Sequence, residues 1–485
     1  MKIKYSIIAI NLSVLLVMIG CSPSKITSAS EDLGIPSKFE KVNETYSDSL
    51  NNAGLVHWKQ YFEDENLKNL IQTALENNQD NLKTLESIRA ARASFRMAKA
   101  GGLPEINAIA GASTRRFGEY TMDGVGNADS NLSPTVPADK MIPDPYRDFL
   151  LGAEFNWELD VWGKYRNRKK AAYARLMASE EMSNHVKTWL IAEVANVYYM
   201  LVGLDEELSI LEKNIQIQNV AFNFAKEMKE AGKENQLAID QFEALLINSK
   251  GKLVQRKREQ RSYELMLSGL LGVYDFDHQR DRLDQVSIGE KLIQVGLPSQ
   301  LINNRPDIRR AELELYASKA DVAGARAAFF PSFNLFGMAG FNAFDFGKLF
   351  FNPASTVFQL GSGLSAPIFN RNSIRMGYEI ANANQRIAML DYEQVVFKSY
   401  LEVLDLVNAI ELFDTQSRLK ETEVEVQQRS VENSNIMFSV GYANYLDVTN
   451  AQQRALEAEI DRVELQVSQI QAKIKLYRAL GGGWQ

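Results

Sequence analysis

Residues 189–215 read WLIAEVANVYYMLVGLDEELSILEKNI. Apolar side chains recur there in alternating steps of four and three, the a/d spacing of a coiled coil, at Leu190, Val194, Val197, Leu201, Leu204, Leu208, Leu211 and Ile215. The stretch belongs to a tract that has no proline between Pro145 and Pro298, and proline interrupts helices. The pattern therefore predicts one helix over 164–231, which at ~1.5 Å per residue is about 100 Å long.

A second proline-free tract follows Pro367 and shows the same spacing in its last part. The apolar series there is Leu456, Ile460, Val463, Val467, Ile470, Ile474 and Tyr477. We predict a long helix over 371–440 and a helix over 445–480, and a helix over 236–272 after the first long helix. Such stripes also form ordinary bundle cores, so their unusual extent is the informative feature.

Four shorter segments, 104–116, 148–159, 331–342 and 356–367, alternate apolar and polar residues. A period of two predicts strands with one apolar and one polar face. Connecting segments rich in Gly, Asn, Asp and Pro, 117–147 and 343–355, join the strands in pairs. Strands of about ten residues with long loops are typical of an outer-membrane barrel. Four strands cannot close a barrel, and unpaired edges cannot face lipid, so several copies are expected to share one barrel.

The two halves of the chain match each other at a constant offset of 209 residues: Gly232, Leu237 and Gln241 correspond to Gly441, Leu446 and Asn450. We predict two repeats, 67–272 and 301–480, each made of a helix, two strands, a very long helix, a tight turn and a helix. An irregular equatorial segment, 273–300, separates them, and 481–485 form a tail. The predicted fold class is mainly α with a β-barrel part.

The N-terminus has the features of a lipoprotein signal. Lys2 and Lys4 precede a short apolar run that ends at Cys21, and the run resembles a bacterial lipobox. We expect a signal peptide over 1–20, then diacylglycerol and an N-acyl chain on Cys21 as the covalent lipid anchor. Residues 21–66 form the leader and N-terminal segment. The alternative is a buried structural cysteine.

Composition disfavours several classes of protein. Lys+Arg 54 against Asp+Glu 61 gives a net charge of −7, so no nucleic-acid partner is expected. One cysteine excludes a disulfide scaffold, and three scattered histidines offer no zinc ligand set. No P-loop or nucleophile elbow is present, so we expect neither an enzyme nor a metal or other cofactor. The basic run Arg256-Lys257-Arg258 is followed by Glu259 and is expected to be a solvated helix face.

Four motifs, in this order and spacing, resemble a TolC-type outer-membrane factor of the OprM/NodT-like lipoprotein branch. They are Asn304-Arg305-Pro306-Asp307-Ile308-Arg309-Arg310-Ala311-Glu312, Ala325-Arg326-Ala327-Ala328-Phe329-Phe330-Pro331-Ser332, Val440-Gly441-Tyr442-Ala443-Asn444-Tyr445-Leu446-Asp447 and Ala479-Leu480-Gly481-Gly482-Gly483-Trp484. The resemblance implies a homotrimer with a twelve-stranded barrel and an α-helical periplasmic tunnel. It further implies a passive exit duct that works with a periplasmic adaptor (membrane fusion protein) and an inner-membrane pump, by analogy of the RND type.

The resemblance also implies roles for two groups of residues. Gly232, Val440 and Gly441 lie in the helix-to-helix turns and are the adaptor-docking candidates; the alternative is a pair of helix C-caps.

Leu446, Asp447 and Asn450 are the candidates for the periplasmic gate, where symmetry-related carboxylates would attract cations. The alternative for Asp447 is a solvated helix-face carboxylate. Trp162 is a candidate for the interfacial aromatic belt, with core packing as its alternative.

Two other classes of protein remain. A periplasmic coiled-coil scaffold or adaptor accounts for the long helices but not for the strands, and an enzyme would need a catalytic set that the sequence lacks. Within the channel class, type I protein secretion and metal efflux compete with drug or small-molecule efflux. The sequence has no Met-rich or His-rich tract that would favour metal. The lipobox together with the ending Leu480-Gly481-Gly482-Gly483-Trp484 favours drug-type RND partners, and the exported substrate is not encoded in a readable motif.

Overall fold

The computed structural model describes residues 36, 38, 39, 52–274, 278–285, 295–351 and 353–484. The predicted signal peptide over 1–20 and the predicted lipidation site Cys21 lie outside these residues. The chain divides into two compact units. The strand unit comprises Ala91–Arg175 and Leu315–Ile387, and the helical unit comprises Leu176–Glu314, Ala388–Gln485 and the described residues up to Ala90.

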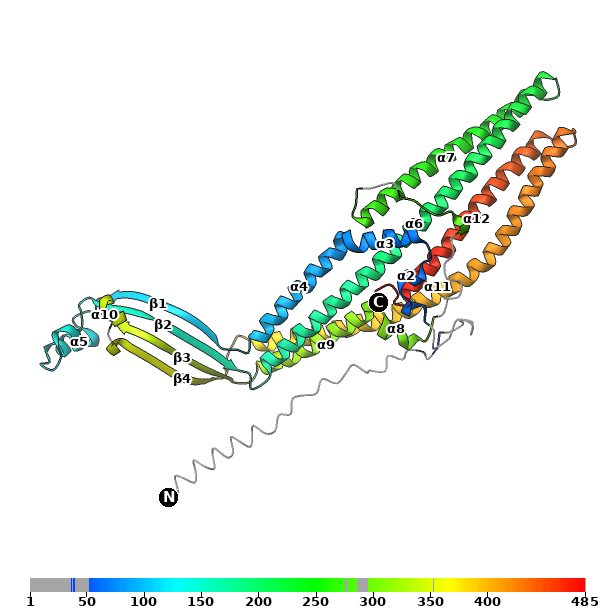
Figure 1. Cartoon of the computed structure of the whole chain (residues 1–485). Helices are drawn as coiled ribbons and strands as arrows, with labels where there is room; N and C mark the ends of the chain where they lie inside the picture. The colour runs from blue at the N-terminus through cyan, green and yellow to red at the C-terminus, as the bar shows by residue number, and fades with distance from the viewer. Residues whose placement is uncertain are drawn as a thin grey trace. The chain divides into compact units, whose positions relative to one another are not determined.

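The strand unit contains one antiparallel sheet of four strands, in the order β1-β2-β3-β4 (Figure 1). Its strands are β1 Glu105–Arg115, β2 Tyr146–Leu159, β3 Ser332–Ala343 and β4 Thr356–Ser365. The four predicted strands are thus confirmed to within two residues at each end. β1 and β4 form the two edges, and β2 and β3 lie inside.

The register of the sheet separates an apolar face from a polar face. Residues directly opposite each other in antiparallel strands share a face, and Phe155 pairs with Ile106 and with Gly337, which in turn pairs with Leu360. The neighbouring set, on the other face, includes Asn107, Glu154, Asn156, Glu158, Asn334 and Gln359. Large side chains on the apolar face stay uncovered within the chain, since Leu360 is 76% exposed and Phe358 is 83% exposed. Such a face requires apolar surroundings.

The two segments that connect the strands are more ordered than their composition suggests. They contain α5 Met122–Leu132, α10 Phe346–Phe351 and the 3-10 turns η3 Ala138–Lys140 and η5 Pro353–Ser355. Thr121 caps α5 by accepting from the Gly124 amide (3.2 Å). The Asn131 side chain then closes the segment, because it bonds both the carbonyl (2.9 Å) and the amide (2.8 Å) of Ile142.

Four helices dominate the helical unit and form two hairpins, α6/α7 and α11/α12 (Figure 1). Both α6 Lys164–Glu230 and α11 Ser373–Ser439 have 67 residues and begin in the strand unit. The return helices are α7 Gln236–Leu271 and α12 Tyr445–Ala479. These spans confirm the predicted long helices. The described residues contain no helix with the length and apolarity needed to cross a membrane.

The predicted apolar seams form the core of the helical unit. On α6, seven of the eight seam residues are buried, from Leu190 (0% exposed) to Leu211 (0%). The first four of them share a buried cluster with Ile474 and Tyr477 of α12, and Leu211 shares one with Leu456 of α12. Gly203 has a packing reason in mid-helix, because a Cβ there would lie 2.4 Å from a methyl carbon of Val467.

The helix predicted before the strands of each repeat is divided in two. In the first repeat the parts are α3 Glu65–Asn77 and α4 Gln79–Ala100, and in the second they are α8 Pro298–Asn304 and α9 Pro306–Ala327. Asn78 interrupts the first pair: its carbonyl oxygen Oδ1 caps α4, and its amide donates to Leu270 O (2.9 Å). Arg305 interrupts the second pair, because a residue before proline avoids helical geometry.

Short elements complete the helical unit. They are η2 Ala53–Leu55, α2 Trp58–Tyr61 and η4 Leu283–Gln285. η4 lies in the described part of the predicted irregular segment 273–300, and Arg280 fixes that part to α6 through Asp205 (Nε to Oδ2, 2.7 Å).

Candidate functional site

The two candidate docking turns have the same main-chain structure. Each closes a long helix with a Schellman pair of hydrogen bonds: Gly232 N to Lys229 O (2.9 Å) with Lys233 N to Met228 O (2.9 Å), and Gly441 N to Phe438 O (3.1 Å) with Tyr442 N to Met437 O (2.8 Å). The repeat offset of 209 therefore extends to the geometry of the turns.

Glycine is needed in both turns for the backbone alone. Gly232 has φ +69° and Gly441 has φ +82°, and no neighbouring atom lies within 4 Å of a Cβ built at either position. The C-cap interpretation thus accounts for both glycines. Val440 is 61% exposed and Tyr442 is 83% exposed, so the second turn also offers an apolar and aromatic surface. Docking to an adaptor stays a prediction.

The helix that follows each turn begins at an asparagine that the sequence analysis did not single out. Asn235 caps α7 by accepting from Ala238 N (3.0 Å). Asn444 caps α12 by accepting from the amides of Leu446 (2.8 Å) and Asp447 (3.1 Å). The signal was present as Gly-x-x-Asn in both turns, since asparagine is a preferred N-cap residue.

The gate candidates lie together on the first turns of α12. Leu446 is 45% exposed, and Asp447 and Asn450 are exposed as well. The Asp447 carboxylate is not simply solvated, because it accepts from Asn444 N (2.9 Å) and completes a capping box. Asp447 therefore has a structural role that neither sequence interpretation included.

The two hairpins pack against each other near their turns. Phe438 of α11 contacts the rings of Phe242 and Phe224, with 6.2 Å between ring centroids in each pair. Val448 of α12 and Ala225 of α6 belong to the same buried cluster. The distance between the two turns is therefore held by aromatic packing.

A layer of buried polar side chains follows this aromatic cluster. Gln218 lies seven residues from both Ala225 and Leu211, which belong to two successive apolar clusters. Gln452 lies between Val448 and Leu456 of the same two clusters. Both glutamines are at most 2% exposed, and their amide atoms have no hydrogen-bond partner among the described residues. These unmade hydrogen bonds destabilise the seam between the hairpins at this layer.

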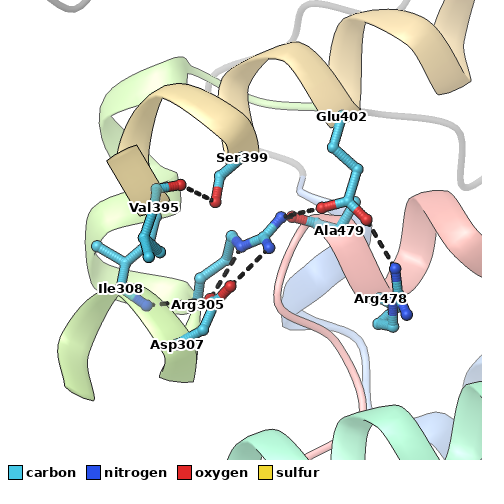
Figure 2. Close-up of polar contacts among 8 residues, drawn as sticks. All are labelled: Arg305, Asp307, Ile308, Val395, Ser399, Glu402, Arg478 and Ala479. Carbon is cyan, nitrogen blue, oxygen red and sulfur yellow. Dashed lines mark hydrogen bonds and ion pairs between the residues drawn. The ribbon is translucent and has the colours of Figure 1, made fainter. Parts of the chain in front are cut away.

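A buried ion network ties together three parts of the second repeat (Figure 2). Arg305 donates to both carboxylate oxygens of Asp307 (3.0 and 2.8 Å) and to Glu402 on α11 (2.8 Å). It also donates to Ala479 O at the end of α12 (2.9 Å), and Arg478 reaches the other oxygen of Glu402 (2.7 Å). Burial opposes the charge on Asp307, but the bidentate contact with Arg305 holds the pKa of Asp307 below its ordinary value. Arg305 and Asp307 belong to the motif beginning at Asn304, and their contacts give that motif a structural role.

A second network corrects an expectation about the helix surface. Arg256 is not solvated: its side chain is 25% exposed and contacts Glu207, Glu259 and Glu464, each at 2.7 Å. Burial raises the pKa of Glu207 to about 7. The charge of Arg256 offsets only part of this effect, and the nearby carboxylates of Glu464 and Glu259 raise the pKa of Glu207 further.

Trp162 packs within the strand unit. Its indole donates to Pro331 O (2.7 Å) and stacks on Phe330, with 4.7 Å between ring centroids. These contacts support the packing alternative, and a place in an aromatic belt stays a prediction. Within the described ranges, no group of three or more His, Cys, Asp and Glu side chains is placed to hold a metal ion.

Comparison with known proteins gives a consistent result. A family model described as outer membrane efflux protein matches residues 70–273 and 297–482. The cation efflux system protein CusC of Escherichia coli O6:H1 is 27% identical over 439 residues, which cover 90% of each chain. The pyoverdine export outer membrane protein OpmQ of Pseudomonas aeruginosa is 28% identical over 474 residues, 96% of this chain and 94% of that one.

Solved structures share the fold. The outer-membrane channel OprN superposes with a TM-score of 0.82 at 24% identity, covering 93% of this chain and 97% of that chain. The open state of the MtrE outer membrane channel of Neisseria gonorrhoeae gives a TM-score of 0.81 at 24% identity, covering 93% and 96%. Both of these solved structures are outer-membrane channels.

Proposed function

The chain belongs to the outer membrane efflux protein family, and from this membership we propose that it is the trimeric exit duct of a proton-driven, RND-type pump for drugs or other small molecules. It is an outer-membrane efflux channel that extends into the periplasm, and its partners are an adaptor and an inner-membrane pump. The trimer, the RND type and the class of cargo are the parts of this statement that need testing.

The observation that best supports the proposed trimer is the open four-stranded sheet. Its apolar face is uncovered and its edge strands β1 and β4 have no further partner among the described residues. Unpaired edges and a barrel wall of four strands are not stable in a bilayer. Three copies supply twelve strands, which lies within the range known for outer-membrane barrels.

The names of the relatives bear on the cargo. Relatives of similar identity are named for cation efflux and for pyoverdine export, so one duct architecture accompanies different cargoes. We infer that the pump, not this chain, selects what is exported. The lipid on Cys21 remains part of the proposal, as an outer-membrane anchor beside the barrel.

We assign adaptor docking to the two turns and gating to the start of α12. The docking candidates lie in the two turns: Gly232 in the first, Val440 and Gly441 in the second. The gate candidates lie just after the second turn, at Leu446, Asp447 and Asn450. In a trimer, three copies of the Asp447 carboxylate would face one axis and favour cations. The polar layer at Gln218 and Gln452 supports opening at this end, since a weak seam repacks at low cost.

An accumulation assay in the native host tests the function. Deleting the chain should raise intracellular accumulation of a fluorescent pump substrate about as much as deleting the pump, and a plasmid copy should restore efflux. Accumulation that stays unchanged while the pump deletion raises it would contradict the proposed duct.

A photo-crosslinking residue tests the docking assignment. At position 440 it should capture the adaptor in cells, whereas at Tyr274, which is 98% exposed and follows the far end of α7, it should not. Capture at Tyr274 but not at Val440 would place the adaptor elsewhere.

A further inference from the structure

A cavity of about 710 Å³ lies at the end of the sheet where the two connecting segments meet. Its lining includes Lys140, Arg147 and Lys348 together with the rings of Phe149, Phe344 and Phe346. Phe149 and Phe346 pack edge to face, with 5.7 Å between ring centroids. Three cationic side chains and three aromatic rings thus line the same cavity.

The register places Arg147 on the apolar face of the sheet. Arg147 pairs with Thr114, and two residues further along β2 Phe149 pairs with Ala112 and Ala343. In the proposed trimeric barrel, on which this inference rests, the apolar face is the one turned to lipid. The cavity involves the inner strands β2 and β3 and no residue of the edge strands, so pairing with further copies would leave it open.

Arg147 lies at the depth of a lipid headgroup. From Arg147 to Trp157 the face runs through Phe149, Leu151, Ala153 and Phe155. Ten residues at ~3.3 Å give about 33 Å along the strand, and a tilt of about 40° reduces this to an apolar band of about 25 Å. The Trp157 end leads into α6 and thus toward the periplasm, so Arg147 lies at the outer leaflet.

The charges in the cavity are only partly compensated. Lys348 donates to the main-chain oxygen of Asp139 and lies 3.7 Å from its carboxylate. Asp345 accepts from Gly347 N (2.8 Å) at the start of α10. The side chains of Lys140 and Arg147 have no hydrogen-bond or ion-pair partner among the described residues, and Lys140 bonds only through its main-chain amide, to Pro137 O (2.9 Å). Two uncompensated cations beside an apolar floor favour an anionic amphiphile.

We propose that this rim cavity binds the phosphorylated headgroup of an outer-leaflet lipid. Arg147 and Lys140 contact the phosphate through charge-assisted hydrogen bonds, and the acyl chains run along the apolar face between Phe149 and Phe155. Bound lipid would fix the height of the barrel in the membrane and order the segments at its mouth.

Native mass spectrometry of the delipidated, detergent-solubilised protein tests the proposal, with bis-phosphorylated lipid A, its dephosphorylated form and inorganic phosphate as separate probes. Wild-type protein should bind the phosphorylated lipid at least about tenfold more tightly than the dephosphorylated lipid. The double variant Lys140→Gln/Arg147→Gln should lose about tenfold in affinity, and Arg147→Lys should lose less.

Arg115→Gln is the matched control. Arg115 lies at the same end of the sheet on the opposite face, paired with Tyr146, so its neutralisation should leave lipid binding unchanged. Equal affinity of wild type and double variant, or equal binding of both lipids by wild type, would overturn the proposal. Inorganic phosphate that binds as tightly as the lipid would do the same, because the cavity would then be a free-anion site. The comparison of the two lipids on wild-type protein tests the proposal even if the double variant does not fold.

Discussion

Arg305 joins three separated parts of the second repeat through one guanidinium, and its side chain is only 11% exposed. Replacing it by methionine leaves the carboxylate of Asp307 without its cation and leaves Glu402 with Arg478 alone. Breaking such a buried pair costs about 3–5 kcal/mol, so Arg305→Met should lower the melting temperature strongly. Arg310→Met, in the helix α9 that follows Arg305, is the control, because Arg310 is exposed. Similar melting temperatures for the two variants would show that the network does not stabilise the helical unit.

Glu207 makes stability depend on pH. Its folded-state pKa of about 7 lies above its ordinary value of 4.5, so the folded state binds more protons between these two values. The contribution of Glu207 to the free energy of unfolding is then fully present below about pH 4.5 and is lost as pH rises through about 7. The groups that face it are Arg256, Glu259 and Glu464. Glu207→Gln should reduce the fall in melting temperature between pH 5 and pH 8 by a few degrees, measured by scanning calorimetry.

Glu206→Gln is the control for this titration, since it removes a neighbouring carboxylate that does not contact Arg256. An identical pH dependence in wild type and Glu207→Gln would exclude Glu207 as its source.

At the scale of elements, Asp447 has two roles at the start of α12 that substitutions can separate. Asp447→Asn keeps an oxygen that accepts from Asn444 N but removes the charge, whereas Asp447→Ala removes both. Asp447→Asn should lower cation preference in planar-bilayer recordings with little change in melting temperature. Asp447→Ala should lower both the cation preference and the melting temperature, because about 1 kcal/mol of stability is lost from the start of the helix. An unaltered ion preference in both variants would limit Asp447 to the capping box.

Periodicity predicted the strands and long helices well, because their apolar patterns extend over many residues. The helix breaks at Asn78 and Arg305, each set by a single residue, were not predicted. Pro306 indicated a break after Arg305, and Asn78 was a weaker indication of the other break. The helix α5 was missed because its sequence, MDGVGNADSNL, contains two glycines and no apolar stripe. The Arg256 network depends on Glu464, 208 residues away, and no local pattern reveals such a pair. The locations of the gate and the turns were accessible from the repeat, but the capping roles of Asn235 and Asn444 went unnoticed.

At the scale of the whole molecule, the sheet and the helices lead to the same requirement. The sheet has an exposed apolar face and two open edges, and the 67-residue helices expose apolar residues such as Leu419 (68%) and Phe397 (62%). A single chain leaves both surfaces in unsuitable surroundings. Assembly with further copies in a membrane would pair the sheet edges, place the apolar face of the sheet in lipid and cover the apolar residues of the helices.

Single-particle electron cryomicroscopy of the purified protein in lipid nanodiscs tests this account most directly. We predict a threefold-symmetric particle in which three chains close one twelve-stranded barrel inside the nanodisc, with β4 of each chain paired to β1 of the next. A single chain with an open sheet, or a helical oligomer without a barrel in the membrane, would contradict the account and favour a periplasmic scaffold.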